Sequence, residues 1–168
     1  MKTCIRSGIL ILTMFYISGM MLSCQDKLHK GMNIEDEIKV FSKGDKIDSD
    51  NFIGDVWVNY LVPSDSVHKV SVGSVTFAPG ARTNWHAHQG GQILLITEGK
   101  GLYQEKGQSI QIIRPGDVIT CQPGTEHWHG ATAEDSMTHI AIGTNTNVGG
   151  AVWSVPVLDE EYQVAPRE

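Results

Sequence analysis

An all-β domain, built as a sandwich or a barrel, is the fold that this sequence predicts. Short runs of β-branched and aliphatic residues alternate with turns at regular spacing, and 18 glycines in 168 residues supply many of those turns. No window of helical length shows a convincing 3.6-residue period. The length suffices for one domain with its own hydrophobic core, and the sequence shows no repeat and no second domain.

The expected strands follow one another from residue 38 towards the C-terminus. They are rich in Val, Ile, Leu, Thr and aromatic residues, and they cover residues 53–62, 70–77, 92–97, 109–113, 117–121, 137–142 and 151–155. Glycine-containing turns at residues 99–101 and 105–107 lie between the third and fourth runs. Strands and turns in this succession, without helices between them, favour a sandwich or barrel.

The first 23 residues differ from the rest of the chain and indicate a secretory signal peptide. Lys2 and Arg6 precede an apolar run at residues 9–17, which is too short for a comfortable membrane span. The segment that ends at Cys24 resembles the lipobox of bacterial lipoproteins, in which the cysteine is lipidated and becomes the mature N-terminus. An ordinary signal peptide that contains a cysteine is the alternative.

The resemblance to a lipobox implies a chain in three parts. Residues 1–23 are the signal peptide, residues 24–37 are a polar tether, and residues 38–168 are the folded domain. Cys24 would then be the lipidated residue. The protein would be exported and anchored to a membrane of a bacterial cell envelope through that lipid only.

The charge balance argues against nucleic acid as a partner. Residues 1–23 contain two basic and no acidic side chains, so the rest of the chain has 11 basic against 19 acidic side chains. An acidic surface is repelled by phosphates. With Cys4 in the signal peptide and Cys24 lipidated, Cys121 has no intrachain disulfide partner, and we expect a small buried strand residue there.

Five of the seven histidines fall in two short segments and one neighbouring strand. His86 and His88 form one His-x-His pair, and His127 and His129 form another. Because side chains alternate between the faces of a strand, the members of each pair point the same way. Gln92 follows the first pair across a glycine-rich turn. Imidazoles with a carboxylate or amide are common metal ligands, so the pattern indicates one metal centre inside a β-barrel.

The spacing of these residues resembles the two motifs of the cupin family. The motifs are Gly80-x5-His86-x-His88-x3-Gln92-x6-Gly99 and Gly116-Asp117-x5-Pro123-Gly124-x2-His127. The resemblance implies a double-stranded β-helix, or jelly-roll barrel, with a divalent metal in its mouth. The positions that match the family's metal ligands are His86, His88, Gln92 and His127. Imidazole and amide ligands accept Mn, Fe, Ni, Co or Zn.

Three further segments, at residues 81–86, 127–131 and 137–141, narrow the similarity. They resemble small single-domain cupins that include manganese-dependent (R)-selective hydroxynitrile lyases. Those proteins have Gln at the fourth ligand position and two additional active-site histidines, which match His129 and His139 here. The resemblance covers about residues 38–162 and implies manganese, a small-molecule substrate and a homodimer as the expected assembly. For His139, a buried core histidine is the alternative.

Gln92 stands where the first cupin motif usually has Glu. Three neutral imidazoles and a neutral amide would leave a site that holds a divalent ion with a net charge of +2, whereas a glutamate would reduce it to +1. A more positive site binds alkoxides better, is a stronger Lewis acid and disfavours oxidation of the metal. Gln92 therefore favours non-redox chemistry on carbonyl and alkoxide groups.

The function that these residues and the resemblance predict is a metal-dependent lyase. It would cleave or form a C–C bond in a cyanohydrin-like substrate, with His129 or His139 as the acid/base. A metal-dependent cupin oxygenase is one alternative, against which Gln92 argues. A non-enzymatic cupin that binds a small ligand is another, against which the two additional histidines argue.

Trp85 and Trp128 alternate with the expected ligands along their strands. We therefore expect both indoles to point away from the metal and to pack between the sheets.

Overall fold

A computed structural model of the chain describes residues 40–163. The predicted signal peptide, the tether and Cys24 lie outside the described residues. Within the described range, no helix has the length and apolar character needed to cross a membrane.

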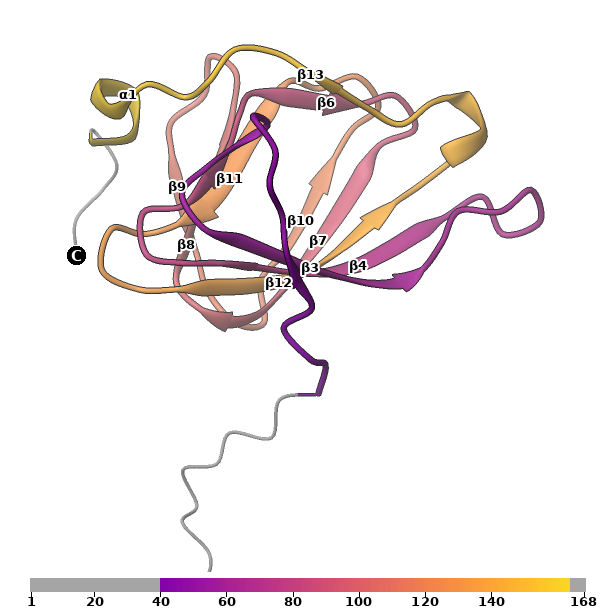
Figure 1. Cartoon of the computed structure of the whole chain (residues 1–168). Helices are drawn as coiled ribbons and strands as arrows, with labels where there is room; N and C mark the ends of the chain where they lie inside the picture. Colours follow the sequence, from indigo (N-terminus) through magenta and orange to yellow (C-terminus); the bar gives the residue numbers. More distant parts are fainter. Residues whose placement is uncertain (1–39, 164–168) are drawn as a thin grey trace, which may run out of the picture. The chain divides into compact units, whose positions relative to one another are not determined.

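The described residues form short strands and very little helix (Figure 1). The strands are β1 (Asp45–Lys46), β2 (Phe52–Ile53), β3 (Val56–Val62), β4 (Ser71–Phe77), β5 (Arg82–Thr83), β6 (His86–His88), β7 (Gln92–Gly99), β8 (Gly101–Glu105), β9 (Gln111–Ile113), β10 (Val118–Cys121), β11 (His127–Ala131), β12 (Met137–Gly143) and β13 (Ala151–Trp153). One 3-10 turn, η1 (Thr146–Val148), and one short helix, α1 (Asp159–Gln163), complete this part of the chain.

The strands form two sheets, which curl around a common interior (Figure 1). The first sheet has the order β1-β3-β4-β12-β7-β10, and the second has the order β13-β6-β11-β5-β2, with β8 and β9 attached through β11. From β4 onwards the chain alternates between the two sheets, and neighbouring strands are antiparallel. This is the jelly-roll arrangement, so the all-β barrel predicted from the sequence is confirmed.

The predicted strand at residues 53–62 is in fact two strands that belong to different sheets. β2 pairs with β5 in the second sheet, whereas β3 pairs with β1 and β4 in the first. Gly54 separates them at φ +78°, a conformation that glycine adopts far more readily than other residues. Only Gly54 and Asp55 separate the apolar residues of the two strands, so the sequence pattern alone did not reveal the change of sheet.

The main hydrophobic core lies between the two sheets. Its buried side chains come from strands of both sheets: Val56, Phe77, Ala81, Leu94, Ile96, Tyr103, Ile113, Cys121, Ala131 and Met137. Cys121 is 2% exposed, which confirms the expectation of a small buried strand residue.

The packing predicted for Trp85 and Trp128 was wrong. The two indoles belong to a second cluster, with Leu102, Ile110 and Val157, and take no part in the core between the sheets. They alternate with inward-facing histidines, so they cover the other face of their sheet. Val157, in the segment before α1, is fully buried against them. The C-terminal segment therefore shields the two indoles from solvent.

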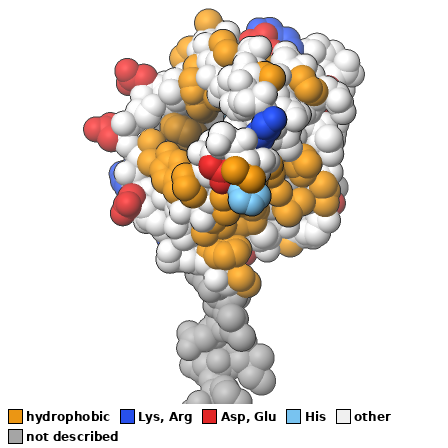
Figure 2. Space-filling model, turned by 90° about the vertical axis from the view of Figure 1, so that its right-hand side faces the viewer, with side chains coloured by type: hydrophobic (Ala, Val, Ile, Leu, Met, Phe, Trp, Pro, Cys, Tyr) orange, Lys and Arg blue, Asp and Glu red, His pale blue; other side chains and the backbone are white. Residues whose placement is uncertain are grey.

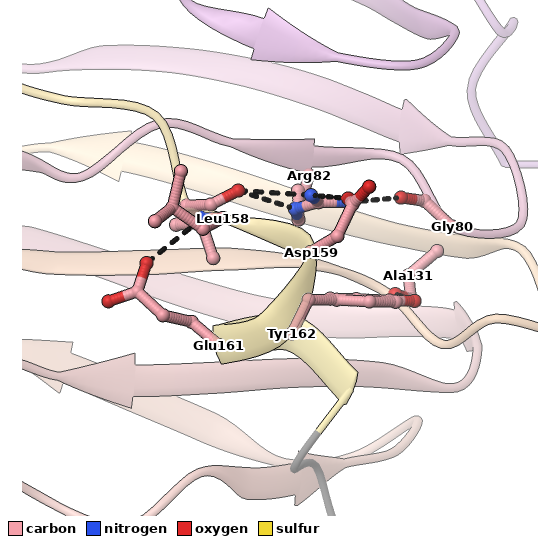
Figure 3. Close-up of polar contacts among 8 residues, drawn as sticks. Gly80, Arg82, Ala131, Leu158, Asp159, Glu161 and Tyr162 are labelled. Carbon is pink, nitrogen blue, oxygen red and sulfur yellow. Dashed lines mark hydrogen bonds and ion pairs between the residues drawn. The ribbon is translucent and has the colours of Figure 1, made fainter.

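Arg82 fastens this C-terminal segment to the barrel (Figure 3). Its guanidinium donates from Nε and Nη2 to the carbonyl of Val157, at 3.2 and 3.0 Å, and from Nη1 to the carbonyl of Gly80 at 3.3 Å. Nη2 also pairs with Asp159 at 2.6 Å. The ring of Tyr162 lies over the guanidinium, with its centroid 4.6 Å from Cζ. The guanidinium of Arg82 thus binds the carbonyl of Gly80, before β5, and two groups around the start of α1 at once.

Candidate metal centre and acid/base site

Strands β6 and β11 bring three histidines of the two sequence segments together. His86 and His127 are direct partners in the antiparallel ladder, and their ring centroids lie 4.3 Å apart. Ring nitrogens of His86, His127 and His129 all lie within 4.8 Å of one another. Imidazole nitrogens that converge in this way, on the buried side of two strands, are suited to hold a divalent metal ion.

The backbone orients two of these rings. Nδ1 of His86 lies 3.0 Å from the carbonyl oxygen of Asn84, and Nδ1 of His127 lies 2.9 Å from that of Thr125. A neutral imidazole that donates its one N–H to a carbonyl keeps the lone pair on Nε2. This is the tautomer that metal-binding histidines need, with the second nitrogen held by an outer partner.

Gln92 reaches the same centre from the other sheet. Its Oε1 lies 3.0 Å from Nε2 of His127. If Nδ1 of His127 carries the proton, Nε2 and Oε1 are two acceptors that face each other. A cation between them satisfies both atoms, because two ligands at about 2.1 Å from one ion, at right angles, are about 3 Å apart. The donor set thus fits a divalent metal ion.

The turn before Gln92 requires its glycines. Gly91 has φ +91°, and a Cβ on Gly90 would lie 2.0 Å from the carbonyl oxygen of Thr144. The carbonyl oxygen of His88 accepts hydrogen bonds from the N–H groups of Gly91 and Gly124, at 3.1 and 2.9 Å. The backbone of His88 therefore joins the turns of both sequence motifs.

The ring of His88 lies at the edge of the group. Its centroid is 5.4 Å from that of His86 and 6.1 Å from that of His127, and the residue is only partly buried. The structure thus places all four expected ligands around one region. The choice of His88 as the third imidazole, instead of the more deeply buried His129, stays a prediction.

His129 belongs to the three-histidine group and also forms a fully enclosed pair with His139. Their ring centroids lie 4.8 Å apart in an edge-on arrangement, and the ring of His129 lies 5.3 Å from that of His86. Phe77 contacts both rings, at 5.7 Å from each. Within residues 40–163, none of the four ring nitrogens of this pair has a hydrogen-bond partner. A buried polar atom without a partner is costly, so these nitrogens are available to a ligand.

Burial keeps these imidazoles neutral at pH 7. Removal from water lowers the pKa of His86 to about 3 and the pKa values of His88 and His139 to about 4. The pKa of His129 falls well below its ordinary value for the same reason, and His139 adds to the effect. Neutral imidazoles are the form that binds a metal or accepts a proton.

Small residues line the inner face next to Gln92. Gly143 is the ladder partner of Gln92, and Ala141 is the partner of Gly73 on the adjoining strand. On the face shown in Figure 2, hydrophobic side chains gather around a hollow in the surface, as is typical of sites for small apolar ligands.

Two residues of β8, Tyr103 and Glu105, and one of β10, Cys121, lie next to the site although the sequence pattern did not connect them with it. Tyr103 and Glu105 are the ladder partners of His129 and His127. The hydroxyl of Tyr103 donates to Glu105 at 3.0 Å and lies 3.3 Å from Sγ of Cys121. Burial raises the pKa of the Cys121 thiol to about 11, so it stays protonated. Strand β8 was not predicted, because its two ends, Gly101 and Glu105, belong to the segments predicted as turns at residues 99–101 and 105–107.

Comparisons with known sequences and structures point to one protein family. Residues 73–143 match the Cupin domain family. An (R)-mandelonitrile lyase from Granulicella tundricola is 42% identical over 115 residues, which are 68% of this chain and 88% of the relative. A cupin-like protein from Thermotoga maritima has a crystal structure with 46% identity and a TM-score of 0.73, covering 75% of this chain and 96% of that one.

More distant structures share only the fold. A DMSP lyase from Ruegeria pomeroyi has 16% identity and a TM-score of 0.54, over 62% of this chain and 54% of that chain.

Proposed function

Because the chain belongs to the cupin superfamily, we propose that it is a metal-dependent lyase that cleaves or forms a C–C bond in a cyanohydrin-like substrate. The observation that carries the proposal is the pair His129 and His139, whose ring nitrogens are buried and have no partner within residues 40–163. His129 lies next to His86 and His127, and the nitrogens of these three residues converge as metal ligands do. The (R)-mandelonitrile lyase similar to this chain supports the same type of substrate.

The ligands in the proposal are His86, His88, Gln92 and His127. They would hold a divalent ion, manganese before Fe, Ni, Co or Zn, and the ion would supply Lewis acidity towards the substrate oxygen. The neutral ligand set leaves the charge of the ion undiminished, which favours the alkoxide form of the substrate.

The histidine pair would move the proton. In the cleavage direction, His129 or His139 accepts the hydroxyl proton, the C–CN bond breaks with its electron pair on cyanide, and the carbonyl forms. The imidazolium then returns the proton to cyanide, which leaves as HCN. The lowered pKa values of both histidines keep the base form present at pH 7. Phe77 packs against both rings and helps to exclude water from them.

The decisive experiment uses one metal-loaded preparation for two assays. Manganese is added to the protein after chelation, and cleavage of mandelonitrile to benzaldehyde is followed together with oxygen consumption. We expect cleavage that depends on the metal, with no oxygen uptake. Oxygen uptake without cleavage would instead support a cupin oxygenase. Stoichiometric metal binding with neither reaction would support a non-enzymatic binding protein.

A further inference from the structure

Glu105 is an acidic residue placed directly beside an expected metal ligand. On the ladder between β8 and β11, Glu105 is the partner of His127. Opposite residues of an antiparallel ladder project from the same face, so the carboxylate and the imidazole share the inner face. Glu105 is partly buried, so water and salt screen its charge less than they would on an open surface.

Tyr103 holds this carboxylate in place. The Tyr103 side chain is 2% exposed, its hydroxyl donates to Oε1 of Glu105 at 3.0 Å, and its ring centroid lies 5.7 Å from that of His127. The same hydroxyl contacts Cys121, which is the ladder partner of Gln92. Glu105, Tyr103 and Cys121 therefore connect the two sheets directly behind the contact between Gln92 and His127.

The charge of Glu105 acts on His127. Because the two residues are directly opposite in the ladder, their Cβ atoms are about 5 Å apart. At this separation the negative carboxylate would attract a cation bound at the imidazole.

We infer that Glu105 is a positioning residue that strengthens the binding of a divalent cation by supplying, one shell outside the ligands, the negative charge that Gln92 does not provide. The inference rests on the metal site of the proposed function. Nδ1 of His127 faces the carbonyl of Thr125, so Glu105 would act through its charge and not through a hydrogen bond to the ring. Loss of an outer partner of a metal site typically weakens metal binding by about 10- to 100-fold. The cation is held more tightly, while the inner ligand set stays neutral.

The experiment separates the charge of Glu105 from its shape. Glu105→Gln keeps the size and the acceptor for the Tyr103 hydroxyl but removes the charge, whereas Glu105→Asp keeps the charge. Glu134→Gln, in the exposed turn between β11 and β12, is the matched control for the loss of one negative charge. The affinity for Mn²⁺ is measured on the chelated full chain by electron paramagnetic resonance of the free ion, with thermal unfolding as a check of folding.

We expect Glu105→Gln to bind Mn²⁺ about 10-fold more weakly than the parent. Glu105→Asp should recover most of the affinity, and Glu134→Gln should bind as the parent does. Equal affinity of the parent and Glu105→Gln would overturn this inference and leave the proposed function intact. So would an affinity of Glu105→Asp as weak as that of Glu105→Gln. A parent that binds no Mn²⁺ would overturn both the inference and the proposed function.

Discussion

Nε2 of His127 and Oε1 of Gln92 lie 3.0 Å apart, although the two residues are separated by 35 positions and belong to different sheets. A shared ion explains a contact between two acceptors. An amide turned by 180° would instead donate its NH₂ group to Nε2 and would need no ion. A change of charge at residue 92 tests whether an ion lies at this contact.

Gln92→Glu is expected to bind Mn²⁺ more tightly and to turn over the cyanohydrin about tenfold more slowly. The added carboxylate attracts the cation, but it also lowers the Lewis acidity of the site and makes the metal easier to oxidise. Metal content and mandelonitrile cleavage are measured on the same preparation. Gln108→Glu, in the exposed turn after β8, is the control for charge alone.

Unchanged cleavage by Gln92→Glu would remove the charge argument for lyase chemistry. Mn²⁺ binding that is no tighter in this variant would show that residue 92 does not contact the ion.

Removal of an expected imidazole ligand should abolish stoichiometric metal binding. His86→Ala and His88→Ala each leave too few nitrogen ligands to retain the ion. The metal content after gel filtration is the measurement. His68→Ala is the control, because the side chain of His68 is 70% exposed and pairs with Asp65 instead. Retention of one equivalent of metal in His88→Ala would point to His129 as the third imidazole.

His139→Leu should lower turnover strongly without loss of stability. His139 is fully buried and without a hydrogen-bond partner in the described part of the chain, so an apolar replacement removes an unsatisfied polar group. We expect a free energy of unfolding equal to that of the parent or higher by about 1 kcal/mol. Turnover should fall by about 10²-fold or more if His139 transfers the proton. Full activity of the variant would show that His139 does not transfer the proton, which would assign this role to His129.

The same variant tests the effect of pH on stability. Burial lowers the pKa of His139 from 6.5 to about 4, so between these values the unfolded chain binds a proton that the folded chain does not. The free energy of unfolding therefore falls as the pH falls from about 6.5 to about 4. Urea unfolding of metal-free protein at pH 7 and pH 4.5 should show a smaller decline for His139→Leu. Equal declines would contradict the lowered pKa.

Arg82 should contribute far more to stability than its acidic partner. Arg82→Ala leaves the carbonyl of Val157 without its donor and removes the contact between the guanidinium and the ring of Tyr162. We expect the free energy of unfolding to fall by about 3 kcal/mol. Asp159→Ala should cost less than about 1 kcal/mol, because the Asp159 side chain is 76% exposed. Urea unfolding measures both variants. A similar loss of unfolding free energy in the two variants would show that the ion pair with Asp159 stabilises this segment, and not the hydrogen bonds to Val157.

We propose that Cys24 is the lipidated N-terminus of an exported protein, on the basis of the lipobox-like sequence before it. Mass spectrometry of the membrane fraction should find an N-terminal peptide that starts at Cys24 and carries acyl chains. Cys24→Ser should move the protein out of that fraction, and Cys121→Ser is the matched control. An unmodified Cys24 on a soluble protein would reject the proposal.

Local sequence determined the elements of this protein and the direction of its key side chains. Strand composition and turn residues predicted the all-β fold, because alternation and glycine-bearing turns act over a few residues. The spacing of His86 and His88, and of His127 and His129, predicted that each pair shares one face, since the period of two is a property of the strand itself.

Only the tertiary structure decided how these elements meet. The ladder register sets Glu105 opposite His127, and the closure of the two sheets brings Gln92 to the same imidazole. The C-terminal segment covers Trp85 and Trp128, which the strand pattern alone had assigned to the space between the sheets. Such contacts depend on which distant strands pair and in what register. That choice is made by the packing of the whole core, and no short stretch of sequence contains it.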